Sequence, residues 1–266
     1  MQAHSTVSDG QLEPAAVVEA AAKAGVATLA LSDHDAVAGV PEAARAAEGL
    51  RLELVPGLEM SCVHEYADDL HVLGYWIDLD SMAPTCERAQ QERVSRAGEI
   101  VERLRSFGSE LTLEDAIAES GDALSVGRPH IARAAGTKPE QMNAFFAEYL
   151  VPGAKAFVAR RWPTADQAVE LIHEAGGAAV VAHPYWDVKD PGQVETLIGA
   201  LEVEGVEAFY PDHDRTQTDH LLRICAERRL TPTGSSDYHG PTHKTFSRFG
   251  AYDTYGLGEP QVPAKP

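Results

Sequence analysis

Short strand patterns alternate with helical patterns over most of this 266-residue chain, and no other feature of the sequence limits its fold as strongly. The strand patterns cover residues 28–31, 52–55, 71–77, 178–182, 206–210 and 230–234. The helical patterns cover residues 13–24, 41–48, 164–174, 192–203 and 217–229. Strands and helices that alternate in this way favour βα units, and so an α/β fold with a largely parallel sheet or barrel.

The strand patterns stop between residues 84 and 160, where only helical patterns occur. One apolar stripe recurs there at helical spacing, formed by Ile100, Val101, Leu104 and Phe107. We therefore expect a barrel built from residues 1–83 and 161–255, with residues 84–160 as an inserted helical subdomain. The last residues, 256–266, are rich in glycine and proline and are expected to form a flexible tail.

The charge of the chain limits its partners. Its 41 acidic residues outnumber its 22 lysines and arginines, which gives a formal net charge of -19 at pH 7. A DNA duplex binds to an extended basic surface that displaces counterions, so this composition argues against such a partner. A small phosphorylated molecule remains a suitable substrate where bound divalent cations reverse the charge locally.

The cysteines and the apolar segments exclude further classes. The three cysteines are scattered and lack CxxC spacing, which argues against a disulfide framework and against a thiolate zinc site. Any metal must therefore be held by histidine and carboxylate. No apolar run is long enough to span a bilayer, and no basic segment precedes an apolar one, so the expected location is the cytoplasm.

Histidines and carboxylates recur near the ends of the predicted strands. They are His4, Asp9, Asp33, His34, Glu59, His183, His213, Asp237 and His239, and His71 differs because it opens a strand. Functional groups collect at the carboxyl ends of strands in βα sheets and barrels, so these residues are expected to converge. Imidazole and carboxylate without thiolate suit Zn²⁺, Mn²⁺ or Fe²⁺. The pattern predicts a site for two or three divalent metal ions.

Six segments carry a resemblance to a known family. In chain order they read HSTVSDG, LALSDHDAVAG, PGLEMS, HVLGY, AHP and GSSDYHG. Together they resemble the polymerase and histidinol phosphatase (PHP) superfamily. The segment GRPHIARA, followed by FFAEYL, is similar to the branch of metal-dependent phosphoesterases that act on nucleoside 3',5'-bisphosphates and on the 5' ends of short RNA. The resemblance implies a distorted (β/α)7 barrel with the metal ions at its carboxyl face.

The resemblance also implies which residues hold the ions. One ion would be bound by His4, Glu59 and Asp237. A second would share Glu59 and add His71 and His183. A third would be bound by Asp9, His34 and His239, and Asp33 would orient His34 from behind.

One position departs from the family. The first motif of the family begins with His-x-His, and this chain has Gln2 where the first histidine would stand. A neutral amide is a poor ligand for a transition metal, so the first ion would lose an imidazole. This leaves open a PHP module with weakened catalysis that retains nucleotide binding.

The predicted reaction is hydrolysis of a nucleotide phosphate monoester by hydroxide that the metal ions activate. The predicted substrate is a nucleoside 3',5'-bisphosphate, with the 5' ends of short RNA as a second class. His213 would act near the scissile group as an acid or an orienting residue. A second phosphate would be bound from the insertion by Arg93, Arg96, Arg128 and His130. Histidinol phosphate phosphatase is the alternative within the superfamily, and the GRPHIARA segment argues against it.

Overall fold

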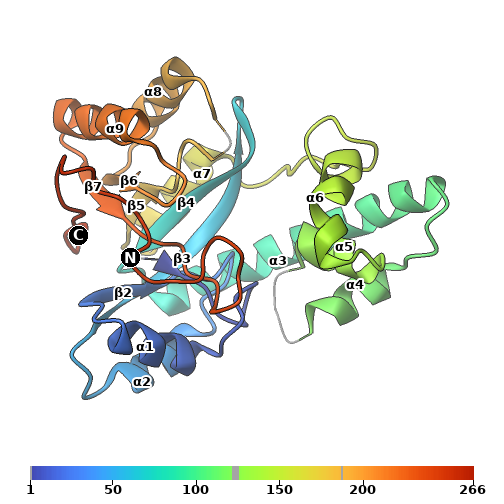
Figure 1. The fold of residues 1–266 in the computed structure, drawn as a ribbon, viewed down its shortest axis with the longest axis horizontal. Helices are drawn as coiled ribbons and strands as arrows, with labels where there is room; N and C mark the ends of the chain where they lie inside the picture. Colours follow the sequence, from blue (N-terminus) through green and yellow to red (C-terminus); the bar gives the residue numbers. More distant parts are fainter. Residues whose placement is uncertain (1, 122–125, 187) are drawn as a thin grey trace.

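The computed structural model describes residues 2–121, 126–186 and 188–266, and its strands form one curled sheet (Figure 1). The seven strands of this described part follow one another in chain order across the sheet. They are β1 Gln2–Ala3, β2 Thr28–Leu31, β3 Glu53–His64, β4 Ala67–Tyr75, β5 Ala178–Val181, β6 Gly205–Phe209 and β7 Thr231–Gly234. The mixed α/β fold with a distorted barrel that the sequence predicted is confirmed.

The sheet is parallel except around β4. Strands β1 to β3 are parallel, as are β5 to β7, but β4 runs antiparallel to both β3 and β5. The N–H of His4 donates to the carbonyl of Tyr238 at 2.8 Å, and Ala3 and Tyr238 form an isolated bridge. The chain after β7 therefore returns to β1 and brings the two edges of the sheet together.

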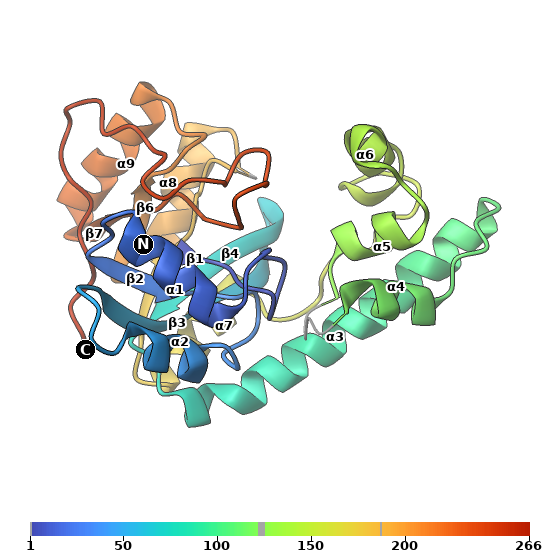
Figure 2. The same ribbon diagram turned by 60° about the horizontal axis from the view of Figure 1, so that its bottom comes forward.

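Helices cover the outer face of the barrel on two sides (Figure 2). The helices of the barrel are α1 Pro14–Lys23, α2 Val40–Ala47, α7 Ala165–Glu174, α8 Pro191–Ala200 and α9 Arg215–Arg228. The first two pack on β2 through an apolar cluster that includes Val17, Val18, Leu29 and Leu31. The last three pack on β4 to β6 through a larger cluster that includes Ile172, Leu197 and Leu221. Burial of these apolar faces holds the strand ends in fixed relative positions.

Strand β3 is much longer than the sequence indicated. The sequence pattern predicted a strand over residues 52–55 only, but the strand continues through Pro56 and Gly57 to His64. Gly57 pairs with Tyr75 of β4, and a Cβ at Gly57 would lie only 3.0 Å from the carbonyl oxygen of Gly74. The glycine therefore permits a close approach of two strands rather than a turn. As a consequence Glu59 lies within a strand and not after one.

The helices of the insertion form a separate body to one side of the barrel (Figure 1). They are α3 Leu79–Ser106, α4 Leu113–Ser120, α5 Arg128–Ala134 and α6 Met142–Phe145, with single turns at Pro139–Gln141 and Phe146–Leu150. Helix α3 spans 28 residues and connects the two bodies. Its first half contributes Met82 and Cys86 to the barrel core, and its second half contributes Ile100 and Leu104 to a second core. We propose these two cores as the physical basis of the domain division expected near residues 84 and 160.

The last residues, 256–266, form no helix or strand but contact the barrel. The N–H of Gln261 donates to the carbonyl of Pro232 at 2.8 Å, and the indole N–H of Trp76 donates to the carbonyl of Pro263 at 2.9 Å. The flexibility expected of this tail stays a prediction. None of the described helices combines the length and apolar character that crossing a bilayer requires.

Candidate metal centre

The predicted ligands lie together at one end of the barrel. They come from the ends of β1, β2, β5 and β7, from the β1–α1 loop, and from inside β3 and β4. His71, the exception in the sequence, is explained by the direction of β4. Because β4 is antiparallel to its neighbours, the middle of β4 lies beside the later half of β3, and His71 pairs with Ser61.

The carboxylate of Glu59 lies at the centre of the group and is 1 % exposed. One of its oxygens, Oε2, lies 3.0 Å from Nε2 of His4, and the same nitrogen lies 3.0 Å from Oδ1 of Asp237. All three atoms are buried and lack a hydrogen-bond partner among the described residues. Buried polar atoms are normally paired, so three unpaired ligand atoms that face one point fit a bound cation.

The other carboxylate oxygen of Glu59, Oε1, faces two further histidines. Oε1 lies 2.9 Å from Nδ1 of His71 and 2.9 Å from Nε2 of His183. The two histidine nitrogens are themselves 3.4 Å apart. Two imidazole nitrogens and one carboxylate oxygen thus meet at a second point, and Glu59 is placed to bridge two ions.

A third group lies beside the first and closer to solvent. Oδ1 of Asp9 lies 3.4 Å from Nε2 of His239, and its Oδ2 lies 3.7 Å from Nε2 of His34. His34 also links this group to the centre, because its Nδ1 lies 3.6 Å from Oε2 of Glu59. Potential ligand atoms of Asp9, His34, His239 and His4 all lie within 4.8 Å of one another. All eight predicted ligands are therefore brought together.

The backbone at this end of the barrel is strained. His183, Asp237 and Asp35 adopt positive φ angles of 24°, 49° and 51°. A residue with a side chain rarely occupies this region, and such conformations concentrate at functional sites. Two of these residues lie in the metal group, where His183 contacts Glu59 and Asp237 contacts His4.

The charges of the site are strongly coupled. Burial alone would raise the pKa of Glu59, but the nearby imidazoles of His71 and His34 hold it well below its usual range. Burial opposes protonation of His183, yet its contact with Glu59 raises its pKa to about 9. Burial also opposes protonation of His4, but Asp237 and Glu59 raise the pKa of His4 well above its usual value. The carboxylates therefore favour positive charge at the points where the ligand atoms meet.

Gln2 lies beneath the metal group and contacts a carboxylate that sequence reasoning missed. Its side-chain Nε2 lies 3.3 Å and 3.2 Å from the two oxygens of Glu207, a fully buried residue of β6. The same carboxylate accepts the backbone N–H of His183 at 3.0 Å. The Oε1 of Gln2 is buried and lacks a partner among the described residues. The carboxylate of Glu207 therefore connects the side chain of Gln2 to the backbone of His183.

Asp33 contacts different groups from those expected. Its carboxylate accepts hydrogen bonds from the N–H and the hydroxyl of Ser5 and from the hydroxyl of Ser8, each at 2.7 Å. It thereby fixes the loop between β1 and α1, which carries Asp9. Within the described part of the chain, no hydrogen bond joins the carboxylate of Asp33 to the ring of His34. Asp33 therefore supports the site through its hydrogen bonds to Ser5 and Ser8.

His213 does not face the metal group. Its ring lies in a neighbouring cavity and is only 3 % exposed. Its Nδ1 lies 3.2 Å from the carbonyl oxygen of Ala208 and donates to it, while burial lowers its pKa to about 4. Its predicted role as an acid or an orienting residue stays a prediction.

The arginines predicted to bind substrate mostly bind the barrel instead. Arg93 donates to Asp35 at 2.5 Å and to the hydroxyl of Ser61 at 2.7 Å. Arg128 is paired with Asp69. The other two predicted residues, Arg96 and His130, line separate cavities, and Nδ1 of His130 accepts the N–H of Gly127 at 2.9 Å. Their role in substrate binding stays a prediction.

The metal group lines a cavity of about 470 Å³ between the barrel and the insertion. Helix α5 supplies Pro129 and Arg133 to its wall, and Arg133 is the sole lysine or arginine among the described residues that line it. The opposite wall is aromatic and contains Trp186, Tyr210 and Phe246. Sequence reasoning missed these residues because nothing in their spacing places them beside the ligands.

Comparison with known proteins gives the family. The model of the PHP domain matches residues 1–195 of this chain. The chain belongs to the PHP domain family. The resemblance predicted from the six motifs is confirmed, and so is the prediction of a metal-dependent phosphoesterase.

Several PHP relatives are similar to this chain over most of its length. The 5'-3' exoribonuclease Rnm of Escherichia coli is 33% identical over 257 residues, which cover 91% of this chain and 85% of the relative. Phosphoribosyl 1,2-cyclic phosphate 1,2-diphosphodiesterase of Eggerthella lenta is 30% identical, with 90% and 93% covered. 3',5'-Nucleoside bisphosphate phosphatase of Chromobacterium violaceum is 30% identical, with 90% and 86% covered.

A solved structure agrees with this assignment. A crystal structure from Bifidobacterium adolescentis, described as a metal-dependent phosphoesterase, superposes with a TM-score of 0.80 at 29% identity. The match covers 94% of this chain and 90% of the other. The insertion is therefore included in the shared fold.

Proposed function

We propose that this PHP protein hydrolyses a phosphate monoester of a nucleotide, preferring nucleoside 3',5'-bisphosphates, with the 5' ends of short RNA as a second substrate class. The observation that carries the proposal is the set of buried, unpaired ligand atoms around Glu59 in a cavity open to substrate. The Chromobacterium violaceum and Escherichia coli relatives support the substrate class. The expected partner is small and phosphorylated, and we keep the cytoplasm as the proposed location.

The donor set fits two or three divalent ions, with Mn²⁺, Zn²⁺ or Fe²⁺ as the candidates, because it combines imidazole with carboxylate and has no thiolate. We propose His4, Glu59 and Asp237 for one ion and Glu59, His71 and His183 for another. Asp9, His34 and His239 would hold the third. Divalent ions bound at such sites supply hydroxide at neutral pH and neutralise the charge on phosphoryl oxygens.

The chain's own residues would orient these ligands. Tyr210 donates its hydroxyl proton to Oδ2 of Asp237 at 3.0 Å, which leaves Oδ1 facing His4 and Glu59. Glu207 fixes the backbone of His183 through its N–H. Such outer contacts hold the ligands in fixed orientations.

Arg133 is the proposed contact for the second phosphate of a bisphosphate. It lines the metal cavity from α5, 43% of its side chain is exposed, and its Nε donates to Glu119 at 2.8 Å. The remaining nitrogens of its guanidinium fork can bind a phosphate, whose geometry this fork matches. Arg93 and Arg128, by contrast, are already paired with carboxylates of the barrel, Asp35 and Asp69.

The test is phosphate release from adenosine 3',5'-bisphosphate with added Mn²⁺, compared with release from histidinol phosphate. The proposal expects faster release from the bisphosphate. Parallel assay of Gln2→His examines the departure in the first motif, since release only after this change would indicate a weakened first site. Equal or faster release from histidinol phosphate would contradict the proposed substrate class.

A further inference from the structure

A second cavity, of about 190 Å³, lies next to the metal cavity. Both cavities share Trp186 and Tyr210 as lining residues. Asp212 and His213, from the loop between β6 and α9, also line the second cavity, and so does Lys189 from the chain after β5. The volume is below the roughly 300 to 1,000 Å³ of sites for drug-sized ligands, so it suits one ring system rather than a whole nucleotide.

Tyr210 connects this cavity to the metal centre. Its ring centroid lies 5.1 Å from that of His183 on one side and 5.3 Å from that of His213 on the other. Its hydroxyl is bonded to Asp237. A group in the second cavity is therefore one aromatic ring away from a phosphate at the metal ligands.

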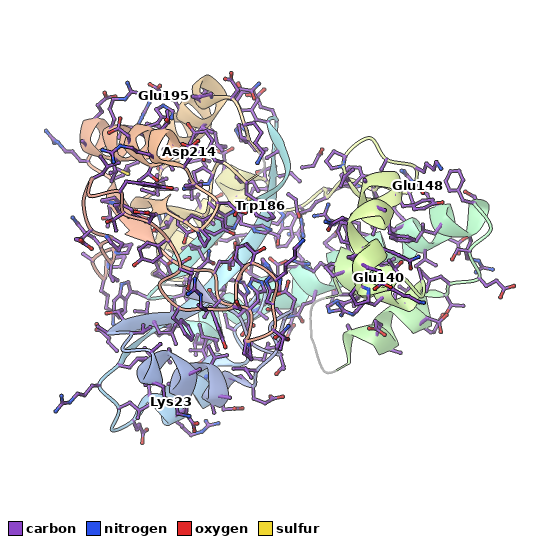
Figure 3. The ribbon with its side chains drawn as sticks, in the orientation of Figure 1. Lys23, Glu140, Glu148, Trp186, Glu195 and Asp214 are labelled. Atoms are coloured by element: carbon purple, nitrogen blue, oxygen red, sulfur yellow. The ribbon has the colours of Figure 1, made fainter. Side chains whose placement is uncertain are left out.

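Trp186 offers a stacking surface at the boundary of the two cavities. Trp186, which is labelled in Figure 3, is 45% exposed, and exposure of so large an apolar group is unusual. Its backbone is nonetheless fixed, because its N–H donates to the carbonyl of His183 at 2.7 Å and its carbonyl accepts from Lys189 at 2.6 Å. Exposed aromatic rings on a rigid backbone are the usual platforms on which nucleobases stack.

His213 supplies a directed hydrogen-bond acceptor. Because its Nδ1 donates to the carbonyl of Ala208, its Nε2 carries a lone pair. This Nε2 is buried and has no partner among the described residues, although the ring lines the cavity. A buried acceptor without a donor costs free energy, which a ligand N–H would recover.

The lining of the cavity favours a base over a phosphate. The positive charge of Lys189 is balanced by the exposed carboxylate of Asp212, and the Lys189 ammonium already donates to the carbonyls of Tyr185 and Trp186. An acceptor and an aromatic face match the N–H groups and the ring of a base. The cationic wall with Arg133 lies instead on the insertion side of the metal cavity.

We propose that this second cavity binds the nucleobase of the substrate, stacked on Trp186, with an N–H group of the base donating to Nε2 of His213. The inference rests on the proposed nucleotide phosphoesterase function and names how that substrate is recognised. It gives His213 a role in binding rather than in proton transfer.

Adenosine tests the cavity without involving the phosphate. Its affinity is measured by calorimetry on the full chain and on Trp186→Ala, with ribose as the ligand that lacks a base. Stacking is worth about 1 to 3 kcal/mol, so Trp186→Ala should weaken adenosine binding by about tenfold to a hundredfold. Phe107→Ala is the matched control, since Phe107 is a 54% exposed aromatic residue of the insertion, and it should change nothing.

His213→Asn tests the hydrogen bond. The shorter amide can still donate to the carbonyl of Ala208 but removes the acceptor at Nε2, so adenosine affinity should fall by about fivefold. In turnover assays both variants should raise KM for adenosine 3',5'-bisphosphate.

The outcomes separate this inference from the proposed function. Adenosine binding that depends on Trp186, in a chain that releases no phosphate from nucleotides, supports the cavity and contradicts the function. Phosphate release with adenosine affinity unchanged in both variants contradicts the cavity and leaves the function standing. Equal affinity for ribose and adenosine also overturns the inference.

Discussion

The metal end of the barrel and the junction with the insertion both gather buried charged residues, but they satisfy them differently. At the junction each carboxylate has a guanidinium partner, as in Arg93 with Asp35 and Arg128 with Asp69. At the metal end, ligand atoms of His4, Glu59 and Asp237 face one another without hydrogen bonds. Carboxylates paired with arginine hold two bodies together, whereas buried carboxylate and imidazole atoms that meet without a hydrogen bond mark a place for a cation.

The pairing extends through the whole junction. Arg160 lies 3.8 Å from Asp35 and 3.6 Å from Asp69, so one buried arginine joins both pairs. Burial opposes ionisation of Asp69, but Arg128 and its neighbours hold its pKa well below its usual range. Burial and the adjacent guanidinium of Arg160 lower the pKa of Arg96 to about 9. The arginines of the junction already contact Asp35 and Asp69, so few of their N–H groups remain for a substrate phosphate.

The largest effect should come from Glu59→Gln, which removes the bridging carboxylate but keeps its shape. We expect phosphate release to fall by at least about 10³-fold, because the amide cannot hold two cations. The chain should remain folded. The matched control is Asp69→Asn at the junction, which should retain most activity. Comparable losses of kcat in the two variants would break the contrast between the regions.

Arg93→Ala should instead damage stability. It leaves Asp35, which is fully buried, without its main counter-charge, at a cost of about 3 to 5 kcal/mol in the free energy of unfolding. Urea unfolding measures this, and Arg105→Ala on the same helix serves as the control. Arg105 makes an exposed ion pair with Glu102, so its loss should cost less than about 1 kcal/mol. A small cost for Arg93→Ala would show that the junction is not held by its ion pairs.

The unpaired nitrogen of His213 predicts a pH dependence of stability. Burial lowers the pKa of His213 to about 4 in the folded chain, against about 6.5 when unfolded. The unfolded state therefore binds more protons between these values, so the stabilisation is complete above pH 6.5 and is lost as the pH falls toward 4. The loss is on the order of 2 to 3 kcal/mol.

Urea unfolding at pH 7.5 and 4.5, with chelator present at both, tests this slope. The variant His213→Asn should show a smaller decrease than the unaltered chain. Identical decreases in the two proteins would rule out His213 as the source of the pH dependence.

The smallest effect concerns the second phosphate. Arg133→Ala should raise KM for adenosine 3',5'-bisphosphate by about tenfold and leave KM for p-nitrophenyl phosphate unchanged, since one charge-assisted contact is lost. Arg128→Ala is the comparison, because its partner is Asp69 and not the cavity. A selective increase in KM for Arg128→Ala alone would restore the assignment made from the sequence.

Much of the fold could be predicted because local patterns determine it. The helices of the barrel and strands β2, β5, β6 and β7 begin and end within about three residues of their predicted limits. Strand β3 could not be predicted in full, because Pro56 and Gly57 are turn residues unless a neighbouring strand approaches closely. The reversal of β4, which explains His71, depends on pairing across the sheet and leaves no local signal.

The convergence of the proposed ligands could be predicted from the sequence, whereas the contacts of the arginines in the insertion could not. Histidines and carboxylates at strand ends converge by the geometry of the barrel, so their identity and order were sufficient. No such rule predicts the contacts of the arginines in the insertion, because their partners Asp35 and Asp69 lie far away in sequence. Asp33 illustrates the same limit, because its contacts to Ser5 and Ser8 depend on how the first loop folds back.

The central claim is that the unpaired atoms around Glu59 bind divalent cations. The most direct measurement is the metal content of the purified chain after dialysis against Mn²⁺, by inductively coupled plasma mass spectrometry, for the unaltered protein and for Glu59→Gln. The account predicts two or three ions per chain in the unaltered protein and a loss of at least one in the variant. Absence of stoichiometric metal, or equal content in both proteins, would contradict it.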